Sequence, residues 1–142
     1  KDPSTQHGAV IVNTNNIPLG FGYNGVPQKI LDRDIDWQRP EKYPFIVHAE
    51  ENAIDHSYSD LNGAVIYVTG MPCVECTKRI ISKKIRRIVY GPRSSNIVPN
   101  EVFDLIKEMC RLAGVGLERF KGNINWIRDT IVSIENNLPE AF

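Results

Sequence analysis

The sequence has 142 residues, which is enough for one folded domain with a hydrophobic core of its own. Its 17 basic residues balance its 17 acidic residues, and this neutral charge argues against a dedicated DNA or RNA binder, since such proteins are usually visibly basic. With 3 cysteines, no apolar run long enough to span a membrane and no visible signal peptide, we expect a protein of a reducing compartment, the cytoplasm.

The chain begins with a predicted antiparallel hairpin. Residues 9–12 are a run of β-formers, residues 18–23 are the partner strand, and polar turn residues separate the two. Gly20 and Gly22 inside the second strand indicate a bulge or a ligand that approaches the backbone closely. Segment 28–44 has no clear period, and a loop of this length in a compact domain is usually functional or mobile.

Helices and strands alternate in the middle of the chain. A helix over 47–58 is followed by an apolar strand over 64–69, whose nearly continuous hydrophobicity is typical of a sheet covered on both faces. Pro72 suits the entry to the next helix, which runs to about residue 83, because its missing N–H costs nothing there. The following strand covers 85–90.

Helices and strands continue to alternate in the last part of the sequence. Asn100 is the predicted N-cap of a helix with apolar residues at helical spacing, among them Cys110, which we interpret as a core residue. Gly114 is the predicted C-cap, 115–120 the last strand, and 125–137 a further amphipathic helix.

This order of elements predicts an α/β fold for a single domain over residues 1–142. Strands that are separated by helices should run parallel through right-handed crossovers, whereas the hairpin is antiparallel. We therefore expect a five-stranded mixed sheet with helices on both faces, a three-layer α/β/α arrangement. Two of the helices would place their N-termini at one edge of that sheet.

Three residues at these helix starts carry the strongest chemical signal. Cys73 and Cys76 stand three apart, so on a first helical turn their sulfurs point the same way, and His48 completes the three nitrogen and sulfur ligands of a catalytic zinc. Glu50 lies close enough to reach a metal-bound water as general acid/base without being a ligand. His-x-Glu followed by Pro-Cys-x-x-Cys is the pattern of zinc deaminases that act on nucleobases. The alternative is a structural zinc with a fourth protein ligand, taken from His7, His56 or Cys110.

Further stretches resemble the cytidine deaminase superfamily and, more narrowly, its deoxycytidylate (dCMP) deaminases. The similarity covers roughly residues 1–90, and the metal motif by itself identifies only the superfamily. The narrower resemblance is carried by Lys1-Asp2-Pro3-Ser4-Thr5-Gln6-His7-Gly8-Ala9, Gly22-Tyr23-Asn24-Gly25-Val26-Pro27, Lys42-Tyr43-Pro44, His48-Ala49-Glu50-Glu51-Asn52-Ala53-Ile54 and Tyr67-Val68-Thr69.

The resemblance implies a cytidine-deaminase-like fold and the zinc-dependent hydrolytic deamination of dCMP to dUMP and ammonia, which feeds thymidylate synthesis. It places one zinc per chain on His48, Cys73 and Cys76, and it makes Glu50 the group that carries protons to N3 of the ring and to the leaving amine.

The resemblance also suggests residues that bind the substrate. Asn24 matches the position that contacts the sugar, and the backbone at Ala49 should help to read the base. The phosphate needs cations or hydroxyl groups, and Arg93, Ser94 and Ser95 are the candidates, although they could equally be plain surface residues.

Allosteric control is a further implication of the resemblance. In such enzymes dCTP activates and dTTP inhibits through a magnesium-bound triphosphate. Gly22, Tyr23, Gly25 and Val26 would line this second nucleotide site, at a subunit boundary of a homohexamer. The family has a helix before the Lys-Asp-Pro stretch, and we expect that helix to be missing from this sequence.

Two other functions stay open at this point. One is a different zinc deaminase of the superfamily, acting on free cytidine, dCTP or tRNA adenosine, although the neutral charge argues against a tRNA substrate. The other is a non-catalytic zinc-binding or nucleotide-binding protein, which would have no turnover to lose when Glu50 is replaced.

Overall fold

The computed structural model describes residues 2–3, 5–38, 40–92, 98–122 and 125. The strands and helices follow the predicted order, and two single turns of 3-10 helix lie in the loop between the second strand and the first α-helix. The elements are β1 (Gly8–Val12), β2 (Pro18–Tyr23), η1 (Asp32–Asp34), η2 (Tyr43–Phe45), α1 (Ala49–Asp55), β3 (Val65–Val68), α2 (Val74–Ser82), β4 (Arg87–Tyr90), α3 (Asn100–Ala113) and β5 (Gly116–Arg119). Of the helix predicted over 125–137, only residue 125 is described.

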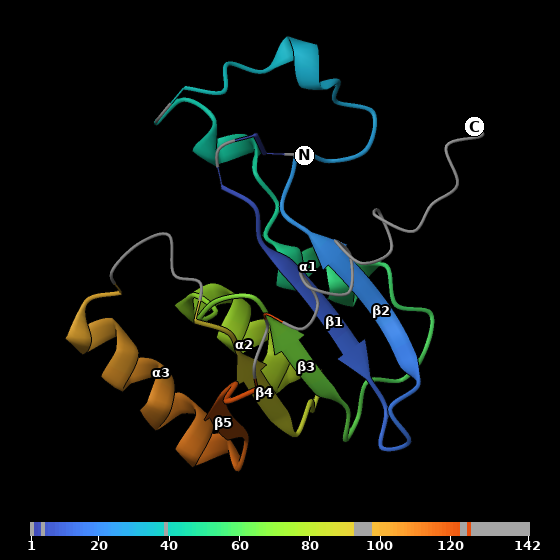
Figure 1. Cartoon of the computed structure of the whole chain (residues 1–142), viewed down its shortest axis with the longest axis vertical. Helices are drawn as coiled ribbons and strands as arrows, with labels where there is room; N and C mark the ends of the chain where they lie inside the picture. Colours follow the sequence, from blue (N-terminus) through green and yellow to red (C-terminus); the bar gives the residue numbers. More distant parts are fainter. Residues whose placement is uncertain (1, 4, 39, 93–97, 123–124, 126–142) are drawn as a thin grey trace.

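The strands form one five-stranded sheet in the order β2-β1-β3-β4-β5 (Figure 1). Strand β1 is antiparallel to both of its neighbours, whereas β3, β4 and β5 run parallel to one another. Each parallel pair is connected by a helix, as parallel strands require. The predicted mixed sheet is therefore confirmed.

Side chains alternate between the two faces of this sheet. Ile11, Ile66 and Ile88 are fully buried on the face that also contains residues of α1, α2 and α3 in one apolar cluster. The residues next to them along the strands form a second cluster on the opposite face, made of Val12, Val65 and Val89 with Val10 and Tyr67 around them. Cys110 belongs to the first cluster, which confirms its interpretation as a core residue.

The helix boundaries differ from the prediction by a few residues. Helix α3 begins at Asn100 itself, because the carbonyl of Pro99 accepts the first helical hydrogen bonds, and Pro99 rather than Asn100 is the N-cap. Helix α1 ends at Asp55 and not at Tyr58, whose fully exposed side chain has no core to pack against. Gly114 ends α3 in the left-handed conformation, φ 68°, as predicted.

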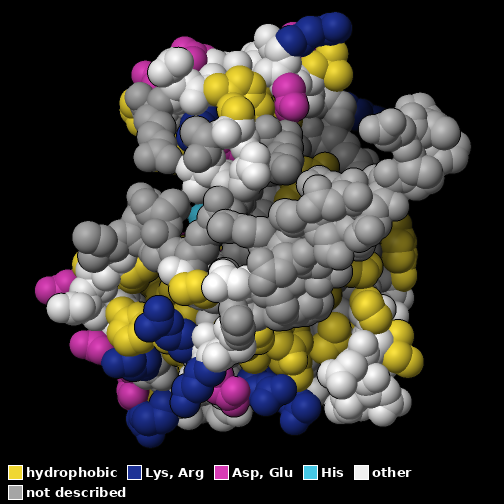
Figure 2. All heavy atoms as spheres, in the orientation of Figure 1, with side chains coloured by type: hydrophobic (Ala, Val, Ile, Leu, Met, Phe, Trp, Pro, Cys, Tyr) yellow, Lys and Arg dark blue, Asp and Glu magenta, His cyan; other side chains and the backbone are white. Residues whose placement is uncertain are grey.

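Charges of both signs are visible on the face of the molecule that Figure 2 shows. Figure 2 shows basic and acidic side chains interspersed around the end of the molecule where α3 and β5 lie. Within the described part of the chain, no helix is long and apolar enough to cross a membrane.

Candidate active site

Two helix N-termini meet beyond the carboxyl end of β3 and bring the predicted ligands together. His48 and Cys73 are the N-cap residues of α1 and α2, each with extended backbone. The Sγ of Cys73 accepts a hydrogen bond from the N–H of Cys76, at 3.4 Å. Cys73 therefore precedes the first turn in which it was predicted. Its sulfur takes the role that a serine or aspartate oxygen usually has at this position.

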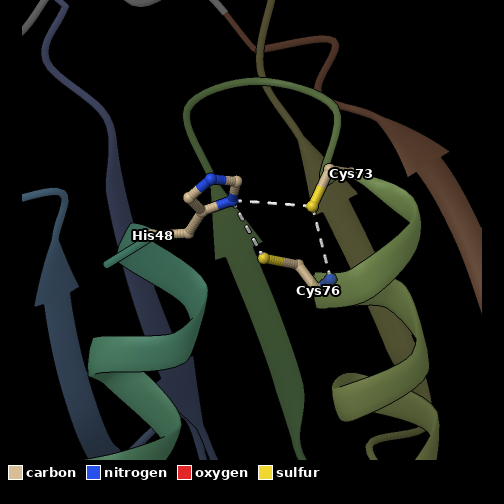
Figure 3. A group of neighbouring side chains, drawn as sticks. All are labelled: His48, Cys73 and Cys76. Carbon is tan, nitrogen blue, oxygen red and sulfur yellow. Dashed lines mark hydrogen bonds between the residues drawn. The ribbon is translucent and has the colours of Figure 1, made fainter. Parts of the chain in front are cut away.

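The three side chains fit a metal ion. The Nδ1 atom of His48 lies 3.5 Å from the Sγ of Cys73 and 3.3 Å from the Sγ of Cys76, as Figure 3 shows. Tetrahedral zinc, with bonds of about 2.0 Å to nitrogen and about 2.3 Å to sulfur, would hold such atoms roughly 3.5 Å apart. Among the described residues, only these three form a cluster of potential ligands, so the alternatives His7, His56 and Cys110 do not complete a four-ligand site.

Hydrogen bonds between the three ligand side chains shift the pKa value of each of them. The hydrogen bond from the Cys76 thiol, with His48 nearby, lowers the pKa of the Cys73 thiol to about 4. The hydrogen bond to Cys73 raises the pKa of His48 to about 9, against the opposing effect of burial. The same contact with Cys73 and burial raise the pKa of the Cys76 thiol. These shifts favour a thiolate at Cys73 and a protonated imidazole at His48.

Glu50 lies beside this cluster on the first turn of α1. Its side chain is buried, and burial raises the pKa of the carboxyl group above its ordinary value. Both Glu50 and the ligands His48 and Cys73 line a cavity of about 510 Å³. A carboxyl group whose pKa is raised by burial in a cavity is suited to accept and deliver a proton.

Asn24 lines the same cavity, and its side-chain amide is fixed from both ends. Its Oδ1 accepts a hydrogen bond from the N–H of His7 at 2.7 Å, and its Nδ2 donates to the carbonyl of Thr5 at 2.7 Å. Ala49 also lines the cavity, next to the His48 ligand. The structure therefore brings the predicted sugar and base contacts to the cavity that holds the ligand cluster.

The remaining predicted site residues lie elsewhere. Arg93, Ser94 and Ser95 fall outside the described residues. None of the four residues suggested for a regulatory nucleotide, Gly22, Tyr23, Gly25 and Val26, lines the cavity. The close approach predicted at Gly22 is made not by a ligand but by the backbone of α1: a Cβ atom there would overlap the carbonyl oxygen of Ala49.

Sequence reasoning missed part of the cavity wall. Asp2, Thr5 and His7 line it from the start of the chain, and Tyr43 lines it from the loop before α1. These stretches carry no periodic pattern, and only their resemblance to a family singled them out. No local signal joins residues 2 and 42, which are 40 positions apart and form an ion pair.

The sequence and the fold of this chain are similar to those of known proteins. A protein family described as "Cytidine and deoxycytidylate deaminase zinc-binding region" matches residues 1–92. The chain is 39% identical to deoxycytidylate deaminase of Mus musculus over 127 residues and 36% identical to that of Homo sapiens, and in both cases 84% of this chain and 70% of the relative are covered. A crystal structure of dCMP deaminase from the cyanophage S-TIM5, in complex with dCMP and dUMP, has the same fold, with a TM-score of 0.62, 24% identity and 82% of each chain covered.

Proposed function

The chain belongs to the cytidine and deoxycytidylate deaminase family and is a deaminase, and from this premise we propose that its substrate is dCMP. The products are dUMP, a precursor for thymidylate synthesis, and ammonia. The observation that carries this proposal is the cluster of His48, Cys73 and Cys76 beside the buried carboxyl of Glu50, in one cavity of a chain whose relatives are deoxycytidylate deaminases.

The Nδ1 atom of His48 and the sulfurs of Cys73 and Cys76 would hold one zinc ion per chain. When bound, zinc would supply a water molecule of lowered pKa. The two helix N-termini favour the negative charge that the ligands then carry.

Glu50 moves the protons of the reaction. Its carboxylate takes a proton from the attacking water and delivers it to N3 of the cytosine ring, while the new C–O bond forms at C4. Glu50 then takes the remaining proton from the hydroxyl group now on C4 and passes it to the amino group. The C4=O bond forms as the C4–N bond breaks, and ammonia leaves. Burial supports this role, because it keeps the pKa of the carboxyl raised and so makes its protonated form accessible.

Asn24 and Ala49 hold the rest of the nucleoside. After its bonds to Thr5 and His7, the Asn24 amide still has one N–H and one oxygen lone pair to offer, a combination that matches a sugar hydroxyl. The backbone at Ala49 contacts the base, and Arg93, Ser94 and Ser95 meet the phosphate.

The substrate is tested by ammonia release from dCMP, deoxycytidine and dCTP. We expect kcat/KM for dCMP to exceed that for deoxycytidine by at least about 100-fold, because a site built for a charged group rejects ligands that lack it. Equal rates for the two would indicate a free-nucleoside deaminase instead. Bound zinc with no ammonia from any of the three would favour another substrate or a structural metal.

Regulation by dCTP and dTTP, with Mg²⁺ on the triphosphate, belongs to the same proposal. Gly22, Tyr23, Gly25 and Val26 form the regulatory site. Gly25 pairs with Val47, the residue before the His48 ligand, through backbone bonds of 2.8 and 3.1 Å. A nucleotide bound at this segment would therefore act on the start of α1.

A homohexamer would place that regulatory segment at a subunit boundary. Support comes from β2, an edge strand of the sheet with large exposed side chains at Phe21 and Tyr23.

Titration with dCTP and dTTP in the presence of Mg²⁺ tests the regulation: activity should rise with dCTP and fall with dTTP. If both nucleotides left activity and melting temperature unchanged, the regulatory site would be rejected.

A further inference from the structure

A fully buried ion pair lies beside the cavity and takes no part in the chemistry above. The Nζ of Lys42 contacts both carboxylate oxygens of Asp2, at 2.9 and 2.8 Å, and the exposed fractions of the two residues are only 1% and 2%. Burying two charges carries a large desolvation cost, and lysine is almost never fully buried unless it is paired. A surface location would have avoided this cost, so the position of the pair requires an explanation.

The pair connects two segments that wall the cavity. Asp2 belongs to the start of the chain, and Lys42 lies in the long loop between β2 and α1, immediately before η2. Figure 1 shows this loop above the sheet, with the start of the chain beside η2. Asp2 and Tyr43, the neighbour of Lys42, both line the cavity. The ion pair therefore fixes one wall segment to the other.

Hydrogen bonds lead from this pair to the substrate side of the cavity. Asp2 Oδ1 accepts a bond from the N–H of Thr5 at 3.1 Å, and the carbonyl of Thr5 accepts the 2.7 Å bond from the Nδ2 of Asn24. The N–H of His7, two residues further along, donates to Asn24 Oδ1. Both ends of the Asn24 amide are thus held by the segment that Asp2 anchors.

We propose that Asp2 and Lys42 are positioning residues for the nucleotide: they hold Thr5 and His7 in place, and these in turn orient the Asn24 amide toward the sugar. This inference rests on the proposed function, since it assigns Asn24 to the sugar of a nucleotide. The pair itself does not contact the substrate. Its loss lets the segment around Thr5 shift, and the Asn24 amide then loses the orientation that matches a hydroxyl.

A double-mutant cycle separates this role from a purely structural one. The binding of dUMP to the zinc-loaded protein is measured by calorimetry for wild type, Asp2→Asn, Asn24→Ala and the double variant. We expect Asp2→Asn to weaken dUMP binding about tenfold, and to have less than a twofold effect when Asn24 is already alanine, because residues that act as a unit are not additive. The same change should raise KM for dCMP more than it lowers kcat.

Controls address folding and charge. Lys107→Met removes an exposed lysine that pairs with Asp104 on α3 and does not line the cavity, and should leave dUMP affinity unchanged. Lys42→Arg keeps the charge and should retain more of the affinity than Lys42→Met. If Lys42→Met does not fold, Asp2→Asn, which is close to isosteric, still provides the cycle.

The outcomes are distinct. Full dUMP affinity in Asp2→Asn, or losses that simply add in the double variant, would overturn the positioning role while leaving the proposed function intact. A wild-type protein that neither deaminates dCMP nor binds dUMP would overturn the proposed function and this inference with it.

Discussion

Glu50 and Glu51 are neighbours on the first turn of α1, yet the fold gives their carboxyl groups opposite environments. Glu50 points into the cavity, and burial raises its pKa. Burial acts on Glu51 too, but hydrogen bonds from the N–H of His48 and from Arg79 outweigh it, so the pKa of Glu51 is lowered. The first carboxyl has the environment that the proposed proton transfer requires, and the second stabilises the helix start that carries His48.

These opposite shifts predict stability effects of opposite sign in the metal-free protein. The pKa of Glu50 is higher in the folded protein than in the unfolded chain. Ionisation of Glu50 therefore lowers the free energy of unfolding as pH rises from the pKa of the unfolded chain toward that of the folded protein. Glu50→Gln should therefore be more stable than wild type at neutral pH, and the advantage should shrink as pH falls toward about 4. The measurement is urea unfolding with chelator and reductant at several pH values.

Glu51→Gln is the matched control for that experiment. In the wild type the pKa of Glu51 is lower in the folded protein than in the unfolded chain. Ionised Glu51 therefore stabilises the fold at neutral pH, and this contribution is lost as pH falls. The Glu51→Gln variant should be less stable than wild type at neutral pH by about 1 kcal/mol. Like the Glu50→Gln difference, this one should diminish in acid. Destabilisation of similar size in both variants at neutral pH would contradict the opposite roles of the two carboxyls.

At the residue scale the sequence is informative where chemistry is local. The spacing of Cys73 and Cys76 and the position of Glu50 after His48 were enough to predict which side chains meet. The capping role of the Cys73 sulfur depends on where α2 begins, and that boundary shifts by one or two residues without changing the pattern. The Asp2–Lys42 pair joins residues 40 positions apart, and no local pattern encodes such a contact.

Among the elements, α1 and β2 determine how closely the His48 helix approaches the sheet. Gly22 allows this contact, because its missing side chain leaves room for the carbonyl oxygen of Ala49 and the N–H of Ala53. The close approach was visible in the sequence as a glycine in a strand, but its partner could be found only in the fold.

Gly22→Ala should therefore destabilise the protein strongly. Its new Cβ would overlap the α1 backbone, which cannot move aside as a flexible side chain can, and overpacking of this kind costs about 1–3 kcal/mol or more. Gly8→Ala is the control on the paired strand: its Cβ would meet neighbours at 3.7 and 3.8 Å, which is ordinary contact, and should change stability by less than about 1 kcal/mol. Equal unfolding free energies for the two variants would contradict this packing.

Helices α1 and α2 must also keep their relative position, because each carries part of the ligand set. Arg79 on α2 donates to Glu51 at 2.7 Å and to Asp55 at 2.9 Å, both on α1. Exposed ion pairs of this kind add less than about 1 kcal/mol to stability each. These ion pairs align the two helices with each other. The separate sequence patterns of α1 and α2 do not reveal this contact between them.

Arg79→Ala should weaken zinc binding more than it weakens the fold. We expect zinc affinity, measured by competition with a chromogenic chelator, to fall by up to about tenfold, since side chains that orient ligands affect metal affinity at this level. Lys78→Ala is the matched control, because among the described residues Lys78 forms its ion pair within α2, with Glu75. Zinc affinities that match in the two variants would argue against a role for the inter-helix contact.

On the scale of the whole molecule, one sheet face and two helix N-termini converge on a single cavity. The hairpin, the parallel strands and the order of helices were predictable from apolar periodicity and turn residues, because those signals are local. The loop between β2 and α1 lacks a period, and its role as a cavity wall depends on long-range contacts such as that of Lys42 with Asp2. Helix ends such as Pro99 and Asp55 depend on neighbours as well.

A metal ion held by His48, Cys73 and Cys76 would join α1 to α2, so its removal should loosen the whole domain. Zinc at about 100 times its dissociation constant stabilises a folded protein by about 2.7 kcal/mol, and for a chain of this size a chelator should lower the melting temperature by about 5 to 10 °C. Added zinc should restore it. In Cys73→Ser, which lacks one ligand, the melting temperature should respond far less to chelator; a full response there would place the stabilising metal elsewhere.

The proposed reaction requires Glu50 to act on dCMP at a zinc site. The decisive measurement is dUMP formation from dCMP by zinc-loaded wild type, Glu50→Gln and Glu108→Gln, with zinc content determined on the same samples. We predict one zinc per chain in all three, wild-type turnover in the exposed control Glu108→Gln, and at least about a 1,000-fold loss in Glu50→Gln. Near wild-type turnover in Glu50→Gln, or zinc-loaded wild type that forms no dUMP, would contradict the account.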